Sequence, residues 1–182
     1  LFAADEFARH GQAARAEELL EQAEKRATRI AWLRTAASMA DYRCDLPNAL
    51  RFWRELLEAE PLALDAQRAV TRLLAETQGR SAALRHLQET CRRFSHHVGL
   101  HELWVEWARG DGIAAEEPIL RELLELNPDH AWAHRELALV FSSQRRFAEA
   151  AAELERAASL EPLAPATFSV RAQVALEAAN FP

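Results

Sequence analysis

The chain has 182 residues, of which 49% are hydrophobic and 27% are charged, and its formal net charge is −6. Nucleic-acid-binding domains are usually strongly basic, so this charge argues against that class. Five glycines and seven prolines are too few for a loop-rich β protein, whereas the length suffices for one compact domain or one array.

Alanine, leucine, glutamate and arginine dominate the composition, and all four favour helices, so we expect an all-α protein. The positive charge consists of 21 arginines and a single lysine, Lys25. A GC-rich coding genome explains this bias most simply, and selection for arginine chemistry is the alternative. Cys44 and Cys91 form no pattern, which indicates free thiols in a reducing compartment, and we expect a cytoplasmic bacterial protein. No apolar run approaches the ~20 residues of a membrane span, and the 182 residues contain no charged stretch followed by an apolar one, the pattern of a leader.

Apolar residues at helical spacing, together with glycine and proline stops, predict the helices in chain order. They are Leu1–His10, Gln12–Ala27, Ile30–Arg43, Leu46–Ala59, Leu64–Thr77, Arg80–Arg93, His97–Arg109, Ile113–Leu126, Ala131–Ser143, Phe147–Leu160 and Pro165–Ala179. Asp45 is the expected N-cap of its helix, with Pro47 in the first turn. Pro118 lies early in its helix and should distort it locally.

A period of about 34 residues relates these helices. Moving back from Phe141 by this step reaches Trp107, Leu74 and Ala40, and moving back from Leu154 reaches Leu120, Leu87 and Trp53. We therefore predict one continuous array over residues 1–182. Its parts are a truncated repeat 1–29, whole repeats 30–63, 64–96, 97–130 and 131–164, and a C-terminal helix in 165–182.

This pattern resembles the tetratricopeptide repeat family along the whole chain. The residues that match best are Leu137, Ala138, Phe141, Phe147, Ala150, Leu154, Ala157 and Pro162, followed by Ala36, Ala37, Ala40, Leu46, Ala49, Trp53, Leu56 and Pro61. Trp104, Glu116, Thr71 and Thr90 depart from it. The resemblance implies a right-handed α-α superhelix, a solenoid of antiparallel helix pairs. It also implies a non-enzymatic scaffold that binds a peptide or protein segment in a concave groove.

In the family, residues one step past the apolar ridge of each first helix line that groove. The equivalent residues here are Arg34, Arg68, His101 and Arg135, which should form a ladder with rungs about 10 Å apart. Arg72, Arg109, Ser38, Tyr42, Trp132 and Leu139 are expected on the same wall. Guanidinium groups match carboxylates, so the ladder suggests an acidic partner. The alternative is that Glu76, Glu102, Glu106 and Glu136 neutralise the arginines in local ion pairs.

The sequence lacks catalytic signatures: it has no glycine-rich phosphate loop, no HExxH and no GxSxG motif. We therefore expect neither an enzyme nor a cofactor. His97 with His101 and His130 with His134 are spaced for metal ligation, but His101 should face the groove and His134 the core. We therefore expect no metal site.

The leading hypothesis is a protein-interaction scaffold without nucleic acid as partner. One alternative is a substrate-recruiting or regulatory module of a larger enzyme. Another is an RNA-processing scaffold, since Leu103, Trp104 and Trp107 also resemble half-a-tetratricopeptide repeats. The pattern begins in mid-helix and ends where another helix should start, so we expect a longer protein. The oligomeric state stays open, because the last helix could pair with a second copy.

Overall fold

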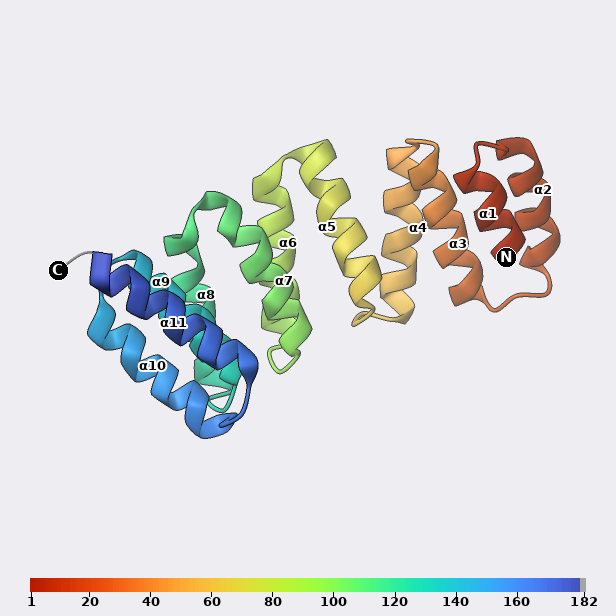
Figure 1. Cartoon of the computed structure of the whole chain (residues 1–182). Helices are drawn as coiled ribbons and strands as arrows, with labels where there is room; N and C mark the ends of the chain where they lie inside the picture. The colour runs from red at the N-terminus through yellow and green to blue at the C-terminus, as the bar shows by residue number, and fades with distance from the viewer. Residues whose placement is uncertain (181–182) are drawn as a thin grey trace. The chain divides into compact units, whose positions relative to one another are not determined.

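The computed structural model describes residues 1–180, which are helical and contain no β-strand. The helices are α1 Phe2–Arg9, α2 Ala13–Glu24, α3 Arg29–Tyr42, α4 Leu46–Ala59, α5 Leu64–Gln78, α6 Arg80–Arg93, α7 Val98–Ala108, α8 Glu117–Leu126, α9 Ala131–Ser143, α10 Phe147–Leu160 and α11 Pro165–Asn180 (Figure 1). The predicted all-α fold of helix pairs is confirmed. No helix in the described range is long and apolar enough to cross a membrane.

The chain divides into two compact units, which are described separately below. Unit 1 comprises residues 1–87 and unit 2 comprises residues 88–182, with the boundary inside α6. In unit 1, α1 packs on α2, α3 packs on α4, and α4 packs on α5. In unit 2, α9 packs on α8, α10 and α11. The predicted division into repeats within one array stays a prediction.

Small residues at the helix contacts let neighbouring helices approach closely. Ala4, Ala16 and Ala37 in unit 1 are completely buried, as are Ala138 and Ala157 in unit 2. Larger side chains such as Leu56 and Leu120 fill the remaining space. Close packing of this kind accounts for the alanine-rich composition.

One predicted helix starts later than expected. Residues Ile113–Glu116 form a 3-10 helix, which follows another at Arg109–Asp111, and the α-helix begins only at Glu117. Pro118 lies in the first turn of α8, where its missing N–H has no partner to lose. The prediction of a single helix Ile113–Leu126 is therefore wrong, because the proline starts a helix here instead of distorting one. The Asp45 cap is confirmed, with its side chain accepting a hydrogen bond from the Asn48 backbone N–H.

The turn within each helix pair contains one residue with positive φ. This residue is glycine in three turns, namely Gly11, Gly79 and Gly112. Cys44 (φ 56°) and Arg145 (φ 61°) take the same place in the other two turns. A side chain with Cβ is disfavoured in this left-handed region, so these two turns carry a local cost that the glycine turns avoid.

Buried polar side chains tie the turns between repeats to the helices that follow. Gln67 Nε2 donates to the Pro61 carbonyl at 2.7 Å, and His134 Nε2 donates to the Pro128 carbonyl at 2.9 Å. Each of these side chains also reaches the second helix of its own repeat. Gln67 Oε1 accepts from His86 Nε2 at 2.9 Å. His134 Nδ1 and Glu153 Oε2 lie 2.6 Å apart.

The other two whole repeats have apolar residues at the positions of these polar pairs. Leu33 and Leu100 take the place of Gln67 and His134, and both are buried. Ile119 and Phe52 stand where Glu153 and His86 would be. The buried polar pair therefore occurs in alternate repeats.

We expect glycine to stabilise the protein at the two turn positions where a residue with a side chain has positive φ. Cys44→Gly and Arg145→Gly should each raise the free energy of unfolding by about 0.5–1 kcal/mol, since the left-handed conformation then loses its steric cost. Urea unfolding followed by circular dichroism measures the change. Cys44→Ala and Arg145→Ala keep the Cβ and serve as controls, and an equal gain in these variants would contradict the explanation.

The pair His134 and Glu153 should be replaceable only as a pair. His134→Leu alone leaves Glu153 with Arg156 as its remaining partner and removes the donor to the Pro128 carbonyl, so it should lower the free energy of unfolding by about 2 kcal/mol. The double variant His134→Leu, Glu153→Ile reproduces the combination of Leu100 and Ile119, and should recover most of that loss. Chemical denaturation of the two single variants and the double variant gives the coupling energy. Additive losses would show that the two side chains do not depend on one another.

Candidate functional site

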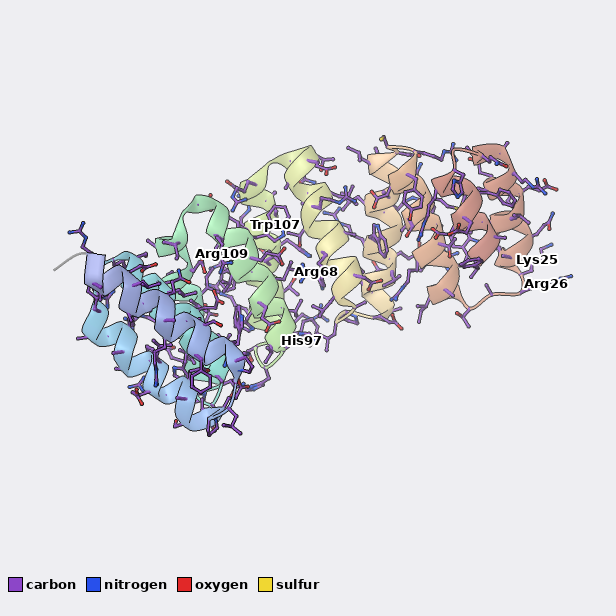
Figure 2. All side chains as sticks on the ribbon, viewed as in Figure 1. Lys25, Arg26, Arg68, His97, Trp107 and Arg109 are labelled. Atoms are coloured by element: carbon purple, nitrogen blue, oxygen red, sulfur yellow. The ribbon has the colours of Figure 1, made fainter. Side chains whose placement is uncertain are left out.

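Five of the predicted groove residues lie on α3 and α5 in unit 1. Arg34, Ser38 and Tyr42 follow one another at one-turn intervals on α3, and Arg68 and Arg72 do so on α5; Figure 2 labels Arg68. Two ion pairs connect the helices. Arg34 Nη1 lies 3.1 Å from Asp65 Oδ2, and Arg72 Nη2 lies 2.7 Å from Asp41 Oδ2. We call these five residues the α3/α5 strip.

Two arginines of the strip, Arg34 and Arg72, are already paired with carboxylates. Arg34 also contacts Glu60 at 3.0 Å, and Arg72 also contacts Glu76 at 3.1 Å. Burial lowers the pKa of Arg72, but the hydrogen bonds that Arg72 donates to Asp41 and Glu76 outweigh burial and raise the pKa overall. The Arg34 and Arg72 side chains are 41% and 43% exposed, so each surface ion pair contributes little to stability. The predicted alternative of local neutralisation by Glu76 is thus present in the structure.

Tyr42 extends the strip toward α1. Its side chain is 45% exposed, and its hydroxyl accepts a hydrogen bond from Arg9 Nε at 2.9 Å. The Arg9 guanidinium also lies 5.8 Å from the centre of the Tyr42 ring. The sequence analysis missed Arg9 and Asp41. For Arg9 a signal existed, because it precedes Gly11 at the same interval at which Tyr42 precedes Cys44.

Two of the residues predicted for the groove are buried in unit 2, so their prediction as exposed rungs is wrong. His101 is 0% exposed and Arg135 is 9% exposed. Most residues of α7 are apolar, and His101 is one of its six buried residues. Arg135 lies on α9, on which α11 packs. Arg135 Nη1 instead contacts Glu161 at 2.6 Å and Thr167 Oγ1 at 3.3 Å.

Three further candidates in unit 2 lie at or near the surface. Arg109, labelled in Figure 2, has a 55% exposed side chain that binds Glu116 at 2.9 Å and Glu136 at 2.7 Å. The hydrogen bond that Arg109 donates to Glu116 is the main cause of the raised pKa of Arg109, and burial raises the pKa of Glu136. Trp132 and Leu139 are half-buried on α9. These residues do not form an uncompensated positive surface.

In two repeats, the arginine predicted to line the groove instead binds the end of the second helix. Arg34 binds Glu60 and Arg135 binds Glu161, and both pairs are 26 residues apart in sequence. Glu60 and Glu161 are the C-cap residues of α4 and α10 and precede Pro61 and Pro162. In these repeats the arginine therefore clamps the end of the second helix. In the repeat 97–130, Asn127 is the C-cap residue, and His101 replaces the arginine.

The histidines have local partners. His97 and His130 cap α7 and α9, because their Nδ1 atoms accept from the backbone N–H groups of Leu100 (3.2 Å) and Ala133 (3.4 Å). His134 is buried, as predicted. Burial lowers the pKa of His101 and of His130, which favours neutral imidazoles. Within residues 1–180 no three His, Cys, Asp or Glu side chains are grouped so that they could hold a metal ion.

The comparisons with known proteins concern the fold. No protein-family model matches the sequence, and no curated protein matches it. Solved structures of tetratricopeptide repeat proteins are nevertheless similar. The C-terminal part of a TPR repeat-containing protein from Cytophaga hutchinsonii has a TM-score of 0.63 at 13% identity, over 96% of this chain and 70% of that chain.

Two other solved structures support the same assignment. A tetratricopeptide repeat protein from Parabacteroides merdae has a TM-score of 0.62 at 13% identity, over 85% of this chain and 62% of that chain. YrrB, a TPR protein, has a TM-score of 0.55 at 15% identity, over 92% of this chain and 88% of that chain. Together with the repeat of about 34 residues and the paired helices, these likenesses show that the chain has the tetratricopeptide repeat fold.

Proposed function

We propose that this chain is a protein-interaction module, and that unit 1 binds a peptide or protein segment along the α3/α5 strip. The observation that supports this is the half-exposed row of hydrogen-bonding side chains on two adjacent helices, with Tyr42 at one end. The fold adds support, since YrrB is described as a TPR protein with an unusual peptide-binding site. Neither observation requires a catalytic group.

Tyr42 is the residue of the strip best suited to anchor a partner. Tyrosine combines a large apolar ring with a polar hydroxyl and few rotatable bonds, which makes it frequent in binding hot spots. Here the bond from Arg9 fixes the ring while 45% of the residue stays accessible. A segment that covers the ring would bury apolar area without the cost of ordering the side chain first.

Charge contributes less than the arginine count suggests. Arg34 and Arg72 pair with four carboxylates, those of Asp41, Glu60, Asp65 and Glu76. An acidic residue of a partner must therefore exchange with one of these carboxylates to reach an arginine. The exchange swaps one exposed ion pair for another, so we propose that acidity of the partner adds modestly to affinity.

A peptide selection tests this function. Peptides selected from a random library on the whole chain should bind about tenfold more weakly to Tyr42→Ala, the loss expected of one hot-spot residue. Arg72→Gln should weaken them less and should reduce the salt dependence of binding. Isothermal titration calorimetry at two ionic strengths measures both effects.

Arg54→Gln is the matched control, because Arg54 is an exposed arginine of α4 outside the strip. Circular dichroism verifies that each variant is folded. If every selected peptide binds Tyr42→Ala and Arg72→Gln as tightly as it binds the unaltered chain, the strip is not the binding surface.

A further inference from the structure

Unit 1 contains a cavity away from the α3/α5 strip, between α2 and α4. Its volume is about 320 Å³, and residues of α3, which packs on both of these helices, form its floor. The floor and walls include Leu20, Trp32, Met39 and Phe52. A cavity of this size lies within the range that accommodates one bulky side chain or a small ligand.

The aromatic walls are held in place before any ligand arrives. The Trp32 and Phe52 rings meet edge to face, with centroids 5.6 Å apart and planes at 87°. Trp32 Nε1 donates to the Leu20 carbonyl at 3.2 Å, which fixes the indole and satisfies its polar group. Both rings are half-buried and line the cavity, so an apolar side chain that enters it would contact them without first displacing a protein group.

The charged side chains around the cavity differ in whether they have a partner of opposite charge or a hydrogen-bond donor. Glu17 forms an ion pair with Arg43. Asp45 caps α4 and accepts from the backbone N–H of Asn48 at 3.4 Å and from its Nδ2 at 2.7 Å, and this side-chain bond is the main cause of its lowered pKa. Both carboxylates that line the cavity therefore already have donors.

Arg51 differs from its neighbours at the cavity. Its Nε and Nη2 donate only to the neutral amide oxygen of Asn48, at 3.3 and 3.0 Å, and its guanidinium lies 4.3 Å from the centre of the Phe52 ring. No carboxylate of the described chain is within ion-pair distance of it. Because an arginine offers five N–H donors, several remain for an incoming acceptor. A carboxylate is the group that matches them best.

We propose that this cavity is a second docking site, for a polypeptide segment that carries a bulky aliphatic side chain next to a carboxylate. The aliphatic group fills the cavity against the touching Trp32 and Phe52 rings, and the carboxylate pairs with Arg51. The site lies on the side of α3 that faces α2 and α4, and it shares no residue with the α3/α5 strip. An experiment can therefore reject this site without rejecting the function proposed above, and the reverse.

Nuclear magnetic resonance on the whole chain with labelled tryptophan indoles tests the site. The probes are N-acetyl-Leu-Glu-amide, its neutral counterpart N-acetyl-Leu-Gln-amide, and N-acetyl-Ala-Glu-amide, which lacks the bulky group. Trp32→Phe identifies the Trp32 signal among the five indoles. The Leu-Glu probe should shift this signal saturably, with an affinity about 2- to 5-fold higher than that of the Leu-Gln probe, as for a partly exposed ion pair. The Ala-Glu probe should bind more weakly than either.

Two arginines of α4 provide a matched comparison. Arg51→Gln should abolish the preference for Leu-Glu over Leu-Gln, whereas Arg54→Gln should retain it, because Arg54 does not line this cavity. Tyr42→Ala should leave both affinities unchanged.

Three results would overturn the proposal. The Trp32 indole stays unmoved by all probes, or the two leucine probes bind equally to the unaltered chain, or Arg51→Gln preserves the preference. A shift confined to the Trp53 indole, which donates to Asp41 beside the strip, would also reject the cavity while leaving the function proposed for the strip intact.

Discussion

Two of the helix pairs depend on satisfying the polar backbone of the turn that precedes them. The turns before α5 and α9 place the Pro61 and Pro128 carbonyls beside buried side chains, where an unpaired acceptor is costly. Gln67 and His134 supply the missing donors to Pro61 and Pro128. Since these side chains are themselves buried, each then needs a partner on the second helix of its repeat. One requirement thus fixes the turn, the first helix and the second helix together.

The sequence predicted the fold from features that act within one helix or one turn. Phe141 and Leu154, which established the period, are both 2% exposed, and Asp45 caps α4 as expected. Helical phase gives the direction of a side chain relative to its own axis. It cannot say which other element covers that side, and for this reason Arg135 was placed in a groove although α11 encloses it. The pairing of Arg135 with Glu161 joins residues 26 positions apart, beyond the reach of local spacing.

The same limit applies to charge and to aromatic residues. Arg34 and Arg51 look alike in the sequence, yet one contacts two carboxylates and the other contacts only a neutral amide. Trp32 and Trp53 are both helical tryptophans of unit 1, yet Trp53 is 6% exposed while Trp32 forms the wall of a cavity. The sites proposed above therefore depend on which hydrogen-bond donors and ring faces stay available after folding, and composition does not report these.

The buried pairs also constrain how such a chain can change in length. Gln67 and His86 belong to the same repeat, as do His134 and Glu153. A gene rearrangement that duplicates or deletes one complete repeat keeps every such pair together, and the backbone carbonyl that each pair needs is supplied by whichever repeat comes before. A breakpoint between the two helices of a repeat would separate the members of a pair and leave one of them without its partner. Evolution by whole repeats is thus compatible with this interior, and evolution by single helices is not.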